Sequence, residues 1–233
     1  MTDVLKDVVV GVAGTGMMGS AHAFRHTAVG FPMMIGSRDP QKAQQLATEI
    51  EQQLTLKSAA PRVRFAGASY KGMVERANFI ILAIPATELR NFIDAYREDI
   101  VSKKKCFMDL PVTFSRYGSS QVLPPTTSDG PNWRGPYFDM INYLSDRLND
   151  PSTGFVKAWH NLYFKSIMNN KVQPVECGGH PRAKAIAMAM MAKEGWEPLD
   201  CGGMEDLLRI ETGFHESRVR DPIHLEFDGP NHP

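Results

Sequence analysis

The chain has 233 residues, in which 26 Lys plus Arg balance 26 Asp plus Glu and leave no formal net charge. This balance disfavours a protein that binds nucleic acid through its phosphates, because such proteins are strongly basic. Hydrophobic residues make up 42% and charged residues 22%, as in an ordinary globular protein rather than a disordered one. The longest apolar stretch, residues 79–84, is too short to span a bilayer.

The N-terminal residues lack the basic-then-apolar order of a secretory signal. The cysteines Cys106, Cys177 and Cys201 form neither a CxxC pair nor an even disulfide framework. We therefore expect a cytoplasmic protein without membrane insertion, without a nucleic-acid partner and with a small-molecule substrate.

Short apolar runs alternate with helix-like stretches along the first half of the chain. Predicted strands cover residues 8–13, 33–36, 63–66, 78–84 and 105–108, and predicted helices cover 17–29, 41–56, 70–76 and 87–100. Strands that alternate with helices imply crossover connections and a parallel sheet covered on both faces. The sequence therefore predicts an α/β fold with a doubly wound, mostly parallel sheet.

The middle of the chain differs, because residues 123–136 are rich in proline and glycine and predict a long loop. Alternation then returns, with predicted helices at 137–149, 181–194 and 204–215 and predicted strands at 155–158, 172–177 and 197–200. We assign residues 1–150 to a dinucleotide-binding domain and residues 151–220 to a small C-terminal, substrate-side α+β part packed on the same sheet. Residues 221–233 form a tail without predicted structure.

A glycine-rich motif follows the first predicted strand and opens the first predicted helix. It consists of Gly14, Thr15, Gly16, Met17, Met18 and Gly19, a GxGxxG pattern. The first glycine permits a tight turn, the second lets the backbone approach a pyrophosphate, and the third lets the helix pack on the strand. The alternative is a chance glycine cluster in a turn, but the flanking strand and helix favour a dinucleotide-binding Rossmann fold.

The residues after the second predicted strand distinguish NADP from NAD. An NAD-selective site usually has Asp or Glu there, to hold the ribose 2′-hydroxyl. This chain has Ser37 and Arg38 instead, with Lys42 one turn into the next helix. A hydroxyl, a guanidinium and an ammonium suit a 2′-phosphate, so we predict NADP(H). Asp39 leaves the NAD alternative open, although its place before Pro40 is typical of a helix N-cap.

Several segments resemble the NADPH-dependent coenzyme F420 reductase family, whose relatives include the reductase domain of the STEAP ferric reductases. They are residues 14–19, 35–43, 81–88, 109–116, 156–161 and 198–202, in the order found in the family. The resemblance implies a dimeric protein with an NADPH-binding Rossmann domain that passes hydride to a second redox partner. The segment 123–136 and the tail after Arg220 are longer than the family pattern, which implies a remodelled second-substrate pocket.

The resemblance also assigns roles to individual residues. It implies that Thr15, Ser37, Arg38 and Lys42 surround the 2′-phosphate, that Ile84 and Pro85 form the turn beside the cofactor, and that His160 and Asn161 approach the nicotinamide. His160 is the candidate catalytic proton donor, because imidazole changes its protonation state near physiological pH. The alternative for His160 is a histidine that only bonds loop backbone.

The second substrate stays open between F420, a flavin, and a carbonyl or imine compound. The rival interpretations are a non-catalytic NADPH-binding sensor and a ferric or flavin reductase that works with a membrane partner. His22 and His26 are spaced like two metal ligands on one helix face, but the sequence supplies no third ligand and we predict no metal site.

Overall fold

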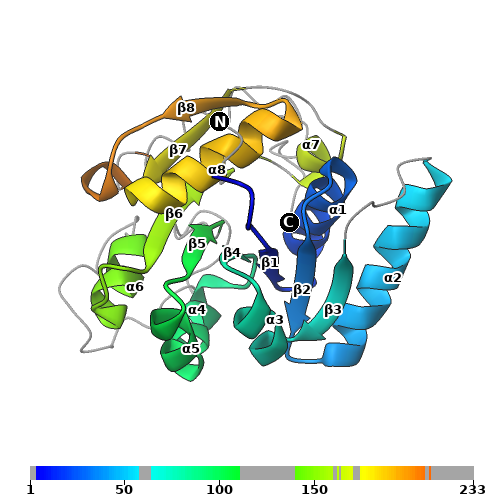
Figure 1. Ribbon diagram of the computed structural model, residues 1–233, viewed down its shortest axis with the longest axis horizontal. Helices are drawn as coiled ribbons and strands as arrows, with labels where there is room; N and C mark the ends of the chain where they lie inside the picture. The colour runs from blue at the N-terminus through cyan, green and yellow to red at the C-terminus, as the bar shows by residue number, and fades with distance from the viewer. Residues whose placement is uncertain are drawn as a thin grey trace, which may run out of the picture.

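The computed structural model describes residues 4–57, 64–110, 140–159, 162, 164–169, 174–207 and 210. The predictions for the loop 123–136, for His160 and Asn161, and for the tail 221–233 lie outside these residues. Within them, eight strands form one sheet in the order β3-β2-β1-β4-β5-β6-β7-β8 (Figure 1). The strands are β1 Val10–Ala13, β2 Met33–Ser37, β3 Phe65–Ser69, β4 Phe79–Leu82, β5 Cys106–Asp109, β6 Gly154–Ala158, β7 Pro174–Gly179 and β8 Glu197–Asp200.

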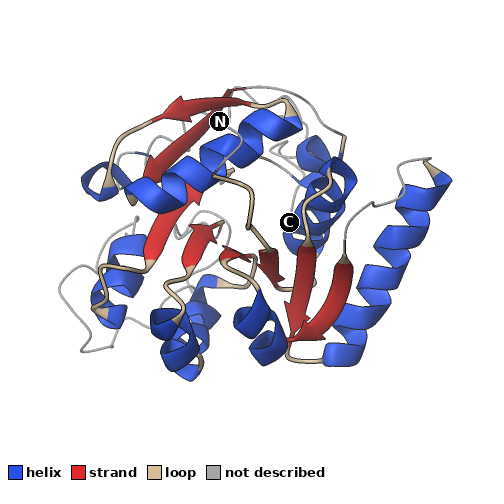
Figure 2. Ribbon diagram, viewed as in Figure 1, coloured by secondary structure: helices blue, strands red, loops and turns tan. Residues whose placement is uncertain are grey.

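The described helices cover both faces of this sheet (Figure 2). They are α1 Met17–Val29, α2 Pro40–Leu56, α3 Tyr70–Arg76, α4 Ala86–Ala95, α5 Arg97–Ser102, α6 Met140–Leu148, α7 Phe164–Met168, α8 Pro181–Glu194 and the 3-10 helix η3 Met204–Asp206. All neighbouring strands pair in parallel except β6 and β7, which are antiparallel. The predicted doubly wound, mostly parallel Rossmann-type sheet is confirmed.

Three predicted elements differ in position or kind from the observed ones. The third strand is shifted to Phe65–Ser69, and the strand expected at 172–177 is Pro174–Gly179. The helix expected at 87–100 is two helices, because the backbone leaves helical geometry at Tyr96. The range 204–215 begins with the 3-10 helix η3, and the described residues that follow it, Leu207 and Ile210, are α-helical as predicted.

The displaced third strand has a physical explanation in its small residues. Its sequence, Phe-Ala-Gly-Ala-Ser, lacks the β-branched residues that mark strands. A Cβ at Gly67 would lie 2.3 Å from the carbonyl oxygen of Ala43 in α2. The small residues therefore serve the close approach of helix to strand, which a search for apolar runs overlooks.

Alternating side chains give the sheet a hydrophobic core on each face, because successive residues of a strand point to opposite sides. In β4, Phe79 and Ile81 pack with α1, α2, α7 and α8, whereas Ile80 and Leu82 pack with α3 to α6. All four side chains are fully buried. Because both faces are covered, the ends of the strands are the places where a ligand can reach the sheet.

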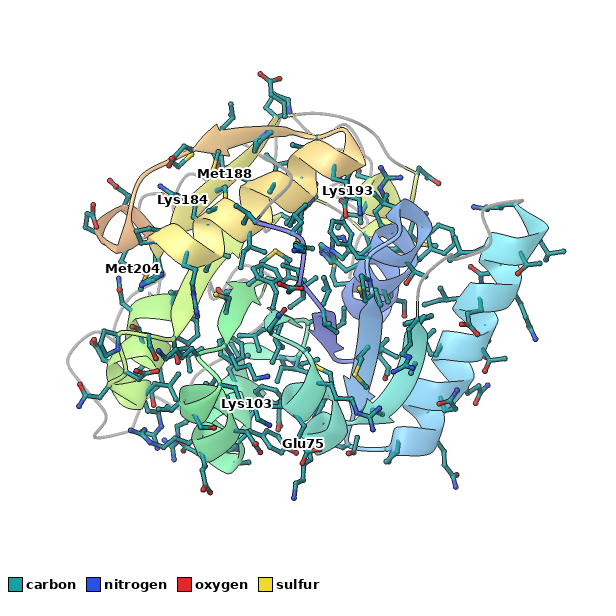
Figure 3. The ribbon with its side chains drawn as sticks, viewed as in Figure 1. Glu75, Lys103, Lys184, Met188, Lys193 and Met204 are labelled. Carbon is teal, nitrogen blue, oxygen red and sulfur yellow. The ribbon has the colours of Figure 1, made fainter. Side chains whose placement is uncertain are left out.

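Helix α8 lies across the first of these faces and is fixed near both ends (Figure 3). Near its start, Lys184 Nζ donates to Asp200 Oδ1 at 2.6 Å. Near its end, Lys193 Nζ lies 4.0 Å from the ring centroid of Phe31, a cation–π contact. The first contact ties α8 to β8, and the second ties it to the N-terminal part of the chain.

A buried polar cluster joins α1 to the end of α8. His22 Nδ1 and His26 Nε2 are 3.2 Å apart, and His26 Nδ1 pairs with Glu194 Oε1. Glu194 Oε2 accepts a hydrogen bond of 2.9 Å from Trp196 Nε1, and the ring of Trp159 lies edge-on to both imidazoles. The two histidines therefore share a face, as their spacing predicts, and their third partner is a carboxylate in a hydrogen-bonded chain.

The three cysteines are free thiols. Burial raises the pKa of Cys177 to about 12 and also raises the pKa of Cys106, so at neutral pH both remain unreactive thiols. Among the described residues, no group of three or more His, Cys, Asp or Glu side chains could hold a metal ion. None of the helices that the structure describes is long and apolar enough to cross a membrane.

Candidate dinucleotide-binding site

The first and last glycines of the GxGxxG turn are required by the fold itself. Gly14 has a φ of +118°, and a Cβ there would lie 2.3 Å from the carbonyl oxygen of Ala83. A Cβ at Gly19 would lie 2.2 Å from the carbonyl oxygen of Gly14. These positions let β1, the turn and α1 pack closely, in agreement with the roles predicted for them.

The middle glycine has no such structural reason. Gly16 has an ordinary φ of −78°, and a Cβ there would meet no atom within 4 Å. It is the N-cap of α1 and makes no side-chain cap for the N–H groups of the first turn. Uncapped N–H groups and the positive end of the helix dipole favour an anion there. The space in front of Gly16 is therefore suited to a phosphate-bearing ligand.

The other three residues of the motif differ in their exposure to solvent. Thr15 is partly exposed, and Met17, at the start of α1, is 67% exposed. Met18 turns inward and packs partly against the core. The motif thus combines a fixed turn with an open, solvent-accessible tip.

The end of β2 lies beside the glycine turn, because Gly14 N donates to Gly36 O at 3.0 Å. The Ser37 hydroxyl accepts a hydrogen bond of 3.1 Å from Asp39 N. The Asp39 carboxylate accepts from the backbone N–H groups of Gln41 and Lys42 and caps α2. Asp39 is therefore the N-cap that its place before proline predicts.

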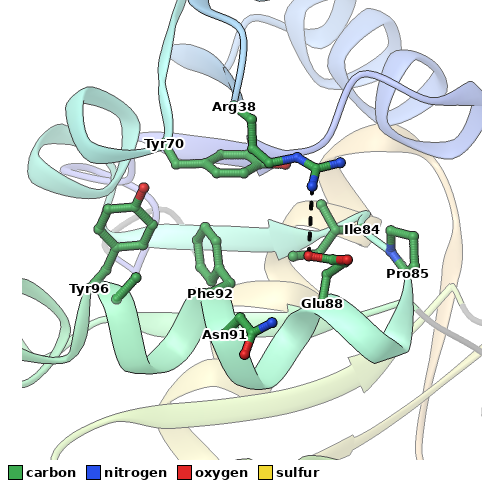
Figure 4. A pocket seen from close by; sticks show the side chains of 9 residues that line it. Arg38, Tyr70, Ile84, Pro85, Glu88, Asn91, Phe92 and Tyr96 are labelled. Carbon is green, nitrogen blue, oxygen red and sulfur yellow. Dashed lines mark ion pairs between the residues drawn. The ribbon is translucent and has the colours of Figure 1, made fainter. Parts of the chain in front are cut away.

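A cavity of about 190 Å³ opens at the same edge of the sheet (Figure 4). It is lined by Arg38, Tyr70, Ile84, Pro85, Glu88, Asn91, Phe92, Ala95 and Tyr96. Three of these residues, Arg38, Ile84 and Pro85, were predicted from the sequence to touch the cofactor. Ser37 and Lys42 lie at the same strand end and helix start but do not line the cavity, and the side chain of Lys42 is exposed.

The floor of the cavity is aromatic. The ring centroids of Tyr70 and Phe92 are 5.2 Å apart, as are those of Phe92 and Tyr96, in edge-on geometries. Burial is the largest cause of the raised pKa of Tyr70 and is also the cause of the raised pKa of Tyr96. Such a surface suits a flat ring, as an adenine is.

Sequence reasoning missed the residues that α3 and α4 contribute to the cavity. A usable signal was present, because Glu88, Phe92 and Tyr96 are spaced by four and share one face of α4 and its C-cap. Tyr70 directly follows β3, the third strand to end at this edge.

The cavity mouth carries one ion pair, between Arg38 Nη1 and Glu88 Oε2 at 3.8 Å (Figure 4). The Arg38 side chain is 80% exposed and that of Glu88 is 43% exposed. An exposed pair at this distance contributes little to stability. The Arg38 guanidinium is therefore available to a ligand.

A second charged pair lies further along the same edge of the sheet. The carboxyl ends of β5 and β6 are paired in register, and Lys157 Nζ donates to Asp109 Oδ2 at 2.9 Å with both side chains buried. Below this pair, Phe107 and Phe155 stack with their centroids 5.2 Å apart. Sequence reasoning missed this pair, although a Lys in an otherwise apolar strand is itself a signal.

Known proteins are similar to this chain in sequence. Residues 9–110 match the model of a family described as NADP oxidoreductase coenzyme F420-dependent. The F420-dependent NADP reductase of Methanothermobacter thermautotrophicus is 24% identical over 214 residues, which cover 89% of this chain and 85% of that protein. The F420-dependent NADP reductase of Methanothermobacter marburgensis is 26% identical over 215 residues, with 89% and 88% covered.

Solved structures share the fold. A protein of Arthrobacter sp. FB24, provisionally named an F420-dependent NADP-reductase, has a TM-score of 0.65 at 18% identity and covers 94% of this chain and 95% of its own. An imine reductase from Pseudomonas sp. has a TM-score of 0.61 at 14% identity, with 94% of this chain and 64% of that chain covered.

The doubly wound sheet and its glycine turn define a Rossmann-type dinucleotide-binding protein. Within that class, residues 9–110 match the model of the coenzyme F420-dependent NADP oxidoreductases, and 89% of the chain aligns with the F420-dependent NADP reductases of the two Methanothermobacter species. At the level of this family, the predictions of the resemblance and of an NADP-dependent oxidoreductase are confirmed.

Proposed function

We propose that the protein binds NADP(H) along the carboxyl edge of the sheet and transfers a hydride between this cofactor and a small redox acceptor. The observation that carries the proposal is the open space at Gly16, at the uncapped start of α1. The pyrophosphate fits that space, and the adenine fits the aromatic cavity beside it. Ser37, Arg38 and Lys42 then surround the 2′-phosphate.

The acceptor we propose is coenzyme F420 or a related deazaflavin, since the archaeal relatives are named for it. Flavins and carbonyl or imine compounds are the acceptors to test beside it. When bound, NADPH supplies the hydride, and the chain supplies position, charge and exclusion of water. We assign residues 1–150 to the cofactor and residues 151–220 to the acceptor side, in a cytoplasmic homodimer.

The Arg38→Ala variant tests the cofactor assignment. We expect its Kd for NADPH to rise about tenfold or more, because a charge-assisted hydrogen bond contributes about 1.5–3 kcal/mol. The Kd for NADH should change little, since NADH lacks the 2′-phosphate. Calorimetric titration of both cofactors measures this, with Arg76→Ala as the control, because Arg76 lies beside the opposite ends of β1 and β2. Equal losses for both cofactors, or a wild type that prefers NADH, would contradict the proposal.

His160, followed by Asn161 on the nicotinamide side, is the proposed proton donor to the acceptor. It follows β6 by two positions, and ligands of open parallel sheets bind at the carboxyl ends of the strands. We expect His160→Ala to lower turnover about 100-fold while the Kd for NADPH stays at the wild-type value. His160→Asn should retain part of the activity, because an amide still donates a hydrogen bond. Steady-state oxidation of NADPH with F420 measures both variants, and unchanged turnover in the alanine variant would reduce His160 to a structural residue.

A further inference from the structure

The cavity places one cation and one anion opposite each other at its mouth. Arg38 comes from the end of β2 and Glu88 from the first turn of α4, and their charged atoms are 3.8 Å apart (Figure 4). Within the part of the chain that the structure describes, neither side chain has another ionic or hydrogen-bonded partner. The guanidinium that would meet the 2′-phosphate therefore already faces a carboxylate of the protein.

We propose that Glu88 is a specificity-determining residue that competes with the 2′-phosphate of NADP(H) for Arg38. Binding of NADP(H) exchanges the Arg38–Glu88 pair for an Arg38–phosphate pair, so part of the favourable interaction is offset by the pair that is lost. A dinucleotide without the 2′-phosphate leaves the pair intact. Glu88 thus limits the preference of the site for NADP(H) and favours release of this cofactor. This inference rests on the proposed function.

The Tyr70 hydroxyl lies in the same cavity, and its pKa responds in opposite directions to the charges of Arg38 and Glu88. Burial is the largest cause of its raised pKa, Arg38 lowers this pKa, and Tyr96 and Glu88 raise it. A negative charge in the cavity is therefore stabilised by Arg38 and opposed by Glu88. A phosphate placed against Arg38 is subject to the same two influences.

A carboxylate in the first turn of a helix also interacts favourably with the helix dipole, and this effect needs a matched control. Helix α5 provides one, because Glu98 occupies its first turn, is exposed and does not line the cavity. Glu98→Gln removes the same charge from the same kind of position as Glu88→Gln. Any effect of overall charge or of helix capping is then common to both variants.

The experiment is calorimetric titration of NADPH and NADH into five proteins: the wild type, Glu88→Gln, Glu98→Gln, Arg38→Ala and the Arg38→Ala/Glu88→Gln double variant. We expect Glu88→Gln to lower the Kd for NADPH about two- to fivefold, the range of an exposed ion pair. Its Kd for NADH and both values for Glu98→Gln should stay unchanged. The gain should decrease at high salt and be absent in the Arg38→Ala background.

Four results would overturn the inference. Weaker NADPH binding by Glu88→Gln would make Glu88 a direct contact of the cofactor, and an equal gain for NADH would remove the link to the 2′-phosphate. A gain that persists in the Arg38→Ala background would show that Glu88 does not act through Arg38. If Arg38→Ala fails to weaken NADPH selectively, the proposed function itself fails; if it does so while Glu88→Gln changes nothing, only the inference fails.

Discussion

At the scale of single residues, the buried imidazole of His22 connects protonation with folding. Its side chain is fully buried beside His26, and the ring of Trp159 lies edge-on to it. Burial lowers the pKa of His22 well below 6.5, and the neighbouring His26 lowers it further as the second cause. The folded state thus holds His22 neutral, whereas the unfolded chain binds a proton below about pH 6.5.

The wild type should therefore lose stability as the pH falls below this value. A group whose folded pKa is depressed costs up to about 1.4 kcal/mol per pH unit once the unfolded state takes up the proton, which amounts to about 2 kcal/mol between pH 7 and pH 5. Urea unfolding of the wild type and of His22→Phe at both pH values measures the difference. The variant keeps an aromatic ring against Trp159 but cannot titrate, so its loss between pH 7 and pH 5 should be smaller. Identical losses would show that His22 does not titrate on unfolding.

At the scale of elements, the turn between β1 and α1 contains glycines that the fold requires and a glycine that the fold does not require. Gly14 and Gly19 are needed because a side chain at either position would meet backbone atoms. Gly16 sits at the tip of the same turn with free space in front of it. One short motif therefore contains two glycines that the fold requires and a third, Gly16, for which we propose a role in binding the ligand.

Valine substitutions should distinguish these two roles. Gly16→Val should fold like the wild type and lose NADPH binding, because its side chain occupies the space proposed for the pyrophosphate. Gly14→Val should be strongly destabilised, because its φ of +118° and the nearby Ala83 carbonyl exclude a side chain. Thermal unfolding and NADPH titration measure both properties. A folded Gly16→Val protein that still binds NADPH with wild-type affinity would place the nucleotide elsewhere.

At the scale of the whole molecule, strand order decides which residues meet. Strands β2 and β4 flank β1 in the sheet, so the glycine turn, the turn after β4 and the end of β2 converge at one edge. The sequence predicted Arg38 at the end of the second strand, and the family resemblance implied that Ile84 and Pro85 form the turn beside the cofactor. It did not predict Tyr70, because the small residues of β3 displaced the expected third strand.

Tertiary structure also created pairs between residues far apart in the chain. Glu194 meets His26 across 168 positions, and Lys157 meets Asp109 across 48. The spacing of His22 and His26 shows only that they share a helix face. The residues that this face contacts depend on the position of α8. Helix α8 packs against β6 and β7, which pair in antiparallel orientation.

The sequence by itself determined the alternation of strands and helices, the glycine turn and the N-cap at Asp39, because each depends on residues close together in the chain. Only the tertiary structure decided that Gly16 has free space in front of it, that Glu88 faces Arg38, and that His26 pairs with the Glu194 carboxylate. These features depend on how crossover connections order the sheet and on which helix faces it brings together. Local periodicity reports which side of an element is buried, but not which distant side chain lies against it.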